Sequence, residues 1–336
     1  MGYAVPNQRG QGIHLRLRAR SFVISDDIKT IAIVIVEKGM GSDLVKTKVI
    51  SMLNEKMGNT IFNDENVSIA GTHTHSGPAG FLQYVLFQLT SIGFVKETFD
   101  AVVNGIVESI LMAYNNMEDA SIKIAINQIN DANINRSPTS YLLNPEEERA
   151  LYDSDTDKDM MLLKFVSDAD KSTLGSLNWF AVHGTSMNNT NTLISSDNKG
   201  YAAYALEKAL NGPDSLPGTG PIVTAFAPTN LGDVSPNTLG AKCIDTGEDC
   251  EPYHSTCNGR SEKCIAFGPG KDMTDSCKII GQKQFEMAKS LMDDASEDIL
   301  GPIDYRHTFV DMSALNVTLA DGSSKKLCSP AMVLLI

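Results

Sequence analysis

The sequence predicts an α/β fold in which helices flank a mixed β-sheet. Short apolar runs that fit strands alternate along the chain with longer segments that carry apolar residues at helical spacing. The chain has 336 residues, of which 42% are hydrophobic, so it can bury a large core. No internal repeat or low-complexity tract interrupts it. We therefore expect one large α/β domain or two smaller ones.

The first half of the chain reads as a hairpin followed by alternating helices and strands. Alternating residues at 13–24 and an apolar run at 30–36, separated by Asp26-Asp27, predict two paired strands. The other apolar segments predict helices at 43–57, 81–89 and 96–117 and strands at 67–70 and 121–128.

The second half continues the alternation. It predicts paired strands at 159–166 and 174–182, a helix at 200–210, a buried strand at 222–227, a helix at 275–294 and a new strand region at 306–319.

Charge and hydropathy exclude several function classes. The net charge is −13, and the isoelectric point is near 4.9. These values argue against nucleic acid as a partner and against electrostatic binding to anionic membranes. No apolar stretch approaches the roughly 20 residues of a transmembrane span, and the N-terminus lacks the apolar core of a signal peptide.

Three of the six histidines follow apolar strands. His73 and His75 stand two residues apart after 66–70, and alternate residues of a strand point to one face. His183 ends a second apolar run that contains the single tryptophan. Such clustered imidazoles suit a divalent metal, most often zinc, although a pair hydrogen-bonded to carbonyls is the other interpretation. His14, His254 and His307 lack this setting, and we expect them to be surface or structural residues.

A polar turn and an arginine loop add further candidates. Ser235 follows the strand at 222–227 in a turn rich in hydrogen-bond donors, where it could be a nucleophile, a substrate-orienting hydroxyl or an ordinary turn serine. It lacks the Gly-x-Ser-x-Gly elbow of serine hydrolases. Arg136 lies in a polar loop and is either a site residue or simply solvated.

Four cysteines recur every seven residues within the loop at 240–270: Cys243, Cys250, Cys257 and Cys264. Because no Cys-x-x-Cys spacing occurs, two disulfides are favoured over a metal cluster, and the spacing leaves three pairings open. Disulfides imply an oxidising compartment, so we expect a secreted or lumenal protein whose signal peptide is missing from this chain. Sequons at Asn66, Asn135, Asn188 and Asn316 agree with that setting. Cys277 and Cys328 are left over.

Taken together, these segments resemble the neutral ceramidase family of zinc-dependent N-acylsphingosine amidohydrolases, over nearly the whole chain and in family order. The resemblance is carried by Met1-Gly2-Tyr3-Ala4, Gly12-Ile13-His14, Arg18-Ala19-Arg20, Gly71-Thr72-His73-Thr74-His75-Ser76-Gly77-Pro78, Asn135-Arg136-Ser137-Pro138, Trp179-Phe180-Ala181-Val182-His183, Ser186-Met187-Asn188, 196–202 and 230–237.

The resemblance implies a chemistry and a role for each candidate. His73 and His183 would be ligands of one Zn²⁺ ion, and His75 the acid/base partner beside it. Gly2, Arg136 and Ser235 would line the polar end of a pocket whose apolar depth takes the lipid chains of ceramide, drawn from a membrane surface. The implied disulfides are Cys243–Cys257 and Cys250–Cys264. The reaction would be hydrolysis of ceramide to sphingosine and a fatty acid.

The chain also departs from the family pattern. Family members are about twice as long, take a glutamate and a tyrosine as further zinc ligands from beyond residue 336, and end in an immunoglobulin-like domain. We therefore expect residues 1–336 to be an incomplete N-terminal catalytic domain, cut short near 333–336, with weak activity or none. A lipid-binding module without catalysis and a serine amidase that uses Ser235 are the competing hypotheses.

Overall fold

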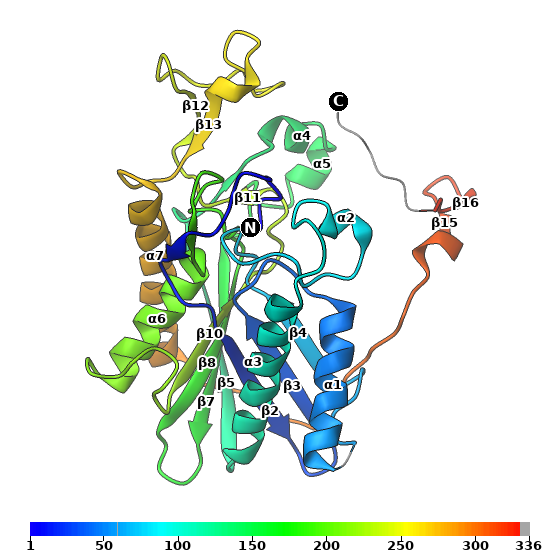
Figure 1. The fold of residues 1–336 in the computed structure, drawn as a ribbon, viewed down its shortest axis with the longest axis vertical. Helices are drawn as coiled ribbons and strands as arrows, with labels where there is room; N and C mark the ends of the chain where they lie inside the picture. Colours follow the sequence, from blue (N-terminus) through cyan, green and yellow to red (C-terminus); the bar gives the residue numbers. More distant parts are fainter. Residues whose placement is uncertain (59, 330–336) are drawn as a thin grey trace.

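Two mixed β-sheets form the centre of the structure, a computed structural model that describes residues 1–58 and 60–329 (Figure 1). In the smaller sheet, β3 (Thr30–Val36) lies between the antiparallel β2 (Ala19–Ser25) and the parallel β4 (Val67–Gly71). The larger sheet has the order β10-β8-β7-β5-β14, with one parallel pair followed by antiparallel pairs. Its strands are β10 (Val223–Ala227), β8 (Thr173–Phe180), β7 (Asp159–Ser167), β5 (Ala120–Gln128) and β14 (Glu297–Asp298).

Two long helices cover the outer face of each sheet (Figure 1). Buried residues of α1 (Asp43–Met57) and α3 (Lys96–Asn115) form one core cluster with the smaller sheet. Those of α6 (Asp197–Asn211) and α7 (Met273–Asp294) form a second cluster with the larger sheet. The layers therefore run helix, sheet, sheet, helix.

The inner faces of the two sheets pack against each other because strand side chains alternate. In β3, Ala32, Val34 and Val36 belong to the cluster under α1 and α3, whereas Ile33 and Ile35 join a third cluster. That third cluster also contains residues of the larger sheet: Phe165, Leu177, Trp179, Ala225 and Ala227. Phe22 of β2 stacks on Phe165 with ring centroids 5.0 Å apart. The alternation along β3 thus determines that one face of the smaller sheet packs on α1 and α3 and the other face packs on the larger sheet.

A buried ionic network also joins the two halves. The Arg20 guanidinium contacts Glu37 Oε1 at 2.5 Å and Glu207 Oε1 at 2.6 Å, and the side chains of all three residues are at most 6% exposed. Glu37 also accepts a hydrogen bond from the Arg18 backbone, and Glu207 from the Thr224 backbone. Burial alone would lower the pKa of Arg20, but the two carboxylates raise it above its usual value. Arg20 therefore remains a cation shared between β2 and α6.

The remaining elements are short. They are β1 (Gly12–Ile13), α2 (Val85–Gln88), β6 (Ile134–Asn135), α4 (Pro138–Leu142), α5 (Glu146–Arg149), β9 (Leu193–Ile194), β11 (Val234–Ser235), β12 (Gly240–Cys243), β13 (Cys264–Phe267), β15 (Asn316–Thr318), β16 (Ser324–Lys326) and the 3-10 turns η1 (Ser261–Lys263) and η2 (Met312–Ala314).

The predicted fold class is confirmed, and the long elements lie where their periodicity placed them. The helix at 43–57 has the predicted bounds, because the Ser42 side chain caps its first turn and Gly58, with φ of 64°, ends it. The sequence predicted a mixed sheet, and in the described residues there are two mixed sheets, of five and three strands, besides four two-stranded pairs. An alternating strand shows that one face is buried but does not show what covers that face.

Three other predictions are only partly right. Helix 81–89 shrinks to α2, since Phe81 is a buried anchor rather than a helical residue. The strand predicted from residue 13 begins at Ala19, because Gly12–Ile13 pair instead with Leu193–Ile194. Region 306–319 contributes only a 3-10 turn and the short β15. The predicted break at 333–336 lies outside the described residues. Within the described part of the chain, no helix is both long and apolar enough to span a bilayer.

Removing the Arg20 charge is expected to destabilise the fold strongly. Arg20→Met leaves two buried carboxylates without their cation, and such a change costs about 3–5 kcal/mol in the free energy of unfolding. Urea denaturation would measure this loss. The control Arg306→Met removes an exposed partner of Asp304 and should cost less than about 1 kcal/mol. Equal stability of the two variants would contradict a structural role for the buried network.

Candidate metal centre

His73 lies two residues beyond β4, in a backbone conformation that turns its ring away from the strand. Its φ is +64°, which is uncommon for a residue with a side chain. Its Nδ1 lies 2.5 Å from the Gly39 carbonyl oxygen. Because a carbonyl can only accept, Nδ1 carries the proton and Nε2 is left with a free lone pair. This is the tautomer that a metal ligand needs.

His183 follows β8 and is oriented in the same way. Its Nδ1 donates to the Leu231 carbonyl oxygen at 2.7 Å, so its Nε2 is also free to bind a metal. The His183 backbone N–H donates to the Val234 carbonyl at 3.0 Å, which ties the histidine to β11. The side chain is buried. The larger sheet thus supplies an imidazole that is fixed at both its ring and its backbone.

His75 completes a group of three imidazoles. Its Nε2 lies 3.1 Å from His73 Nε2, and one ring nitrogen from each of His73, His75 and His183 lies within 4.8 Å of the others. Within residues 1–58 and 60–329, the buried His75 Nδ1 has no hydrogen-bond partner. Tyr3 packs its ring edge-on to His75 at 4.6 Å and donates its hydroxyl hydrogen to the Met187 carbonyl at 2.7 Å.

The two sheets meet at the histidines through a close backbone contact. Thr74 forms an isolated parallel bridge with Gly184, and the His75 N–H donates to the Gly184 carbonyl at 3.1 Å. A Cβ at Gly184 would lie 2.5 Å from the His73 carbonyl oxygen, which no real side chain permits. The sequence predicted that His73 and His75 converge because they share a strand face. They converge instead in a loop, where this contact and the left-handed His73 position them.

Burial keeps the imidazoles of His75 and His183 neutral. Desolvation first, and then the neighbouring His73, His183 and Arg136, lower the pKa of His75 to about 3. Desolvation lowers the pKa of His183 to about 4, with the Leu231 hydrogen bond opposing the shift. A neutral imidazole is the form that binds a divalent metal, so near pH 7 these two rings need not lose a proton to do so. The donor set therefore fits zinc.

The β6–β11 pairing brings the arginine and serine candidates toward this group. Val234 pairs with Asn135, and Ser235 with Ile134. Arg136 is exposed, and its Nη2 donates to the Gly232 carbonyl at 2.7 Å. Its effect on the pKa values of His75 and His183 places it within their electrostatic range. Ser235 is buried, and its Oγ accepts a hydrogen bond from the Asn237 N–H. In the described structure, no histidine or carboxylate is hydrogen-bonded to that hydroxyl.

Gly2 lies against the same loop. A Cβ at Gly2 would lie 2.9 Å from the His75 Cα, so any side chain there would displace His75. A cleft of about 950 Å³ elsewhere, lined largely by β2 and α3, includes none of the predicted site residues. The three other histidines lie outside the group: His14 contacts Ser195 Oγ, and His254 pairs with Glu251.

Comparison with known proteins places this geometry in one family. Residues 1–334 match the family model for the N-terminal part of the neutral/alkaline non-lysosomal ceramidases. The chain belongs to this family. Curated relatives include neutral ceramidase B of Dictyostelium discoideum, which is 47% identical over 94% of this chain and 44% of its own length. Neutral ceramidase 1 of Arabidopsis thaliana is 42% identical over 99% of this chain and 51% of its own length.

Solved ceramidase structures agree with the fold. The crystal structure of neutral ceramidase from Pseudomonas aeruginosa matches with a TM-score of 0.83 and 34% identity, and it covers 100% of this chain and 49% of that chain. A structure described as ceramidase complexed with C2 matches with a TM-score of 0.84 and 35% identity. The chain spans about half the length of the curated relatives it matches.

Sequence reasoning missed the hydrogen bonds that support the loop after His183. The buried Asp197, with φ of +56°, accepts hydrogen bonds from the backbone of Ser186 and Met187. Asn198 Nδ2 donates to the His183 carbonyl at 2.9 Å. Together these hydrogen bonds hold the loop between His183 and Met187, whose carbonyl accepts a hydrogen bond from Tyr3. The available signal was an Asp-Asn pair before the predicted helix at 200–210, which in fact begins at Asp197.

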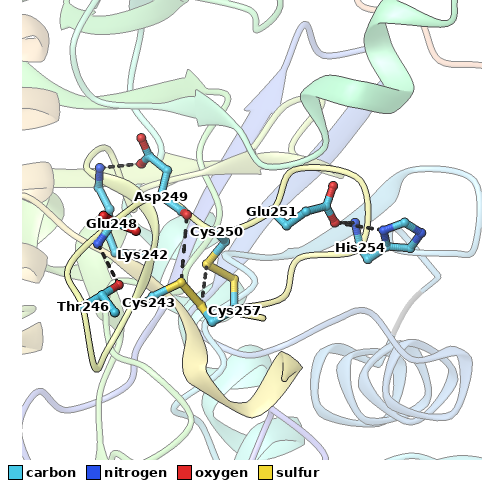
Figure 2. The surroundings of a disulfide bond; sticks show 10 residues. Lys242, Cys243, Thr246, Glu248, Asp249, Cys250, Glu251, His254 and Cys257 are labelled. Atoms are coloured by element: carbon cyan, nitrogen blue, oxygen red, sulfur yellow. Dashed lines mark hydrogen bonds and ion pairs between the residues drawn. A yellow bond between two sulfur atoms is a disulfide. The ribbon is translucent and has the colours of Figure 1, made fainter. Parts of the chain in front are cut away.

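The cysteine-rich loop forms both disulfides that the family resemblance implies. Cys243 joins Cys257, and Cys250 joins Cys264, each across a sequence separation of 14. Figure 2 shows how closely the two bonds lie, with Cys250 Sγ and Cys257 Sγ 3.8 Å apart. Because these sulfurs are bonded, their proximity is not a thiolate metal site. Cys277 and Cys328 are free cysteines, and Cys277 is buried.

Enlarging Gly184 is expected to separate the two halves of the metal centre. In Gly184→Ala, the new methyl group forces the His73–Thr74 backbone away, and zinc affinity should fall about tenfold or more. Isothermal titration with Zn²⁺ would measure the change. Gly232→Ala is the matched control, because a Cβ there has nothing within 4 Å. Unchanged affinity in both variants would show that the backbone contact does not set the site.

Proposed function

We propose that the chain carries the zinc-binding and substrate-orienting part of an amide hydrolase that cleaves ceramide into sphingosine and a fatty acid. The observation that carries the proposal is the convergence of three imidazoles, one sheet supplying His73 and His75 and the other His183. Family membership supplies the reaction class. When bound, zinc supplies a Lewis acid that makes a water molecule nucleophilic near neutral pH.

The remaining roles in the proposed reaction fall to side chains around the metal. His73 and His183 are the metal ligands, since each donates its Nδ1 proton to a carbonyl and leaves Nε2 free. His75 is the acid/base group, because its buried Nδ1 has no partner and can take a proton and return it to the departing sphingosine amine. The exposed Arg136 guanidinium attracts the carbonyl oxygen of the substrate as negative charge develops there.

Ser235 and Gly2 orient the substrate. The Ser235 hydroxyl accepts from Asn237 and keeps its own hydrogen available for a polar group of ceramide. Among the residues that the structure describes, no base is hydrogen-bonded to this hydroxyl, so a role as nucleophile is disfavoured. Gly2 leaves the space beside His75 open. The lipid chains would occupy an apolar pocket that continues from this polar end.

A second candidate function is lipid binding without catalysis. The ligand set of the candidate metal centre favours this alternative. Within residues 1–58 and 60–329, that set consists of imidazoles alone. With His75 kept as the acid/base group, two imidazole ligands hold zinc less firmly than a complete four-ligand shell. Turnover by this chain is then expected to be weak. Bound ceramide in the absence of zinc would favour this alternative.

Metal removal separates the candidates. We expect the purified chain to bind zinc and to hydrolyse a fluorescent short-chain ceramide slowly, with turnover abolished by a chelator and restored by added Zn²⁺. His73→Ala and His183→Ala should each lower zinc affinity about tenfold or more, whereas the exposed His254→Ala should not. Activity that survives the chelator would point to Ser235 as nucleophile. Absence of both zinc binding and turnover would leave only the lipid-binding candidate.

We also propose that the protein matures in the secretory pathway, as its paired cysteines require. The sequons then differ in accessibility. Both amide hydrogens of the buried Asn66 are used, by the carbonyls of Thr30 and Ile61, and Asn135 is also buried. Asn316 is exposed, and Asn188 is partly exposed.

Glycan mapping tests this proposal. On the protein secreted from eukaryotic cells, we expect glycans at Asn188 or Asn316 and none at Asn66 or Asn135, because a glycan cannot be attached to a buried, hydrogen-bonded amide in the native fold. Peptide mass spectrometry after endoglycosidase treatment would locate them, with Asn316→Gln as the control that removes one site. Occupancy at Asn66 in folded protein, or retention of the reduced chain in the cytosol, would contradict the proposal.

A further inference from the structure

Residues 82–95 form a surface loop, here called the apolar loop, with an unusual composition. The loop contains no Asp, Glu, Lys or Arg, although 21% of the whole chain is charged. Its large apolar side chains face outward: Val85, Leu89 and Ile92 are 74%, 66% and 85% exposed. The other exposed members are Tyr84, Leu86, Phe87 and Phe94. Contiguous exposed apolar surface of this kind marks an interaction site.

The apolar loop is a closed unit and not a loose connection. The Val95 N–H donates to the Gly80 carbonyl at 2.8 Å, and the buried Phe81 anchors the entry to the loop. A Cβ at Gly80 would lie 2.6 Å from the Val95 side chain, so the two ends of the loop touch. The loop therefore presents a fixed surface.

Its polar groups are largely satisfied from within. The Gln88 side-chain amide donates to the carbonyls of Leu82 and Gln83, each at 3.1 Å. The Ser91 hydroxyl lies 2.8 Å from the Gly93 carbonyl oxygen. With carbonyls paired inward and apolar side chains outward, the loop can enter a medium that offers no hydrogen bonds at a low cost.

The loop follows the candidate metal centre closely along the chain and lies at the same end of the molecule as the N-terminal segment. It begins seven residues after His75. In Figure 1, α2, which is part of the loop, lies at the same end of the molecule as the N-terminal segment that packs on His75. The short α4 and α5 lie at that end too, where Leu143 and Leu151 are 86% and 74% exposed.

We propose that the apolar loop docks the protein on a lipid surface of zero net charge, such as a phosphatidylcholine bilayer. Two observations select this partner. The loop has no cation to attract anionic lipids, and both the net charge of −13 and Glu146–Glu148 on α5 repel them. The identity of the lipid to be extracted, ceramide, rests on the proposed function, but docking itself does not. Burial of several apolar side chains in the interface supplies the affinity.

Vesicle flotation of the complete 336-residue chain tests the docking. We expect binding to phosphatidylcholine vesicles and weaker binding to vesicles that contain equal phosphatidylcholine and phosphatidylserine. The triple variant Val85→Ser, Leu89→Ser, Ile92→Ser should bind at least about tenfold more weakly, since it removes three inserted apolar side chains. The matched control Ile28→Ser, Leu300→Ser, Phe309→Ser alters side chains that are equally exposed but lie outside the loop, and it should bind like the wild type.

Other outcomes would overturn the proposal. They are equal binding of wild type and loop variant, preference for the phosphatidylserine vesicles, or no binding of the wild type. A dimer seen by light scattering that the loop variant dissociates would assign the surface to a second copy of the chain instead. Zinc titration of the same variants keeps the two proposals apart: docking that persists without zinc binding would overturn the proposed function alone. A melting temperature equal to that of the control would show that the loop variant is folded.

Discussion

The candidate metal centre depends on how the two sheets are placed against each other, because neither sheet leads into all three of its histidines. The smaller sheet leads into His73 and His75, and the larger leads into His183. Two interactions fix the position of one sheet relative to the other. The first is the apolar contact between their inner faces, and the second is the ion pairing of Arg20 with Glu37 and Glu207. At the histidines themselves, only Gly184 lets the two backbones come close enough. A shift of one layer by even a side chain's width would separate the ring nitrogens.

The same arrangement determines the protonation state of the site. Burial and the positive charges of neighbouring groups both lower the pKa values of His75 and His183, so these two imidazoles are neutral. The exposed Arg136 adds a fixed positive charge at the open side. The neutral ring nitrogens of His75 and His183 are donors of the kind that a divalent metal takes, and Arg136 is a cation within their electrostatic range.

Part of the fold and of the candidate site could be predicted from the sequence, and there are physical reasons why the rest could not. Long helices such as 43–57 and the histidine-bearing strand ends follow from local periodicity and capping, which the sequence contains directly. The division into two sheets does not, because the same alternation in β3 would serve a sheet covered by helices on both faces. The close approach at Gly184, the hydrogen bonds from the Ser186–Met187 backbone to Asp197, and the packing of Tyr3 on His75 join residues that are well separated in sequence. Only the fold brings them together, so composition and spacing carry no signal for the partner of each.

The crosslinked hairpin of β12 and β13, which stands out from the end of the molecule in Figure 1, has a topological consequence. The two disulfides overlap in sequence, each enclosing one cysteine of the other. Any single cleavage of the backbone between Cys243 and Cys264 therefore falls inside at least one closed ring. The segment that ends with Ser235 and the segment that begins with α7 would stay covalently joined after such a cut. A protease can thus cut this exposed hairpin without releasing either half of the protein.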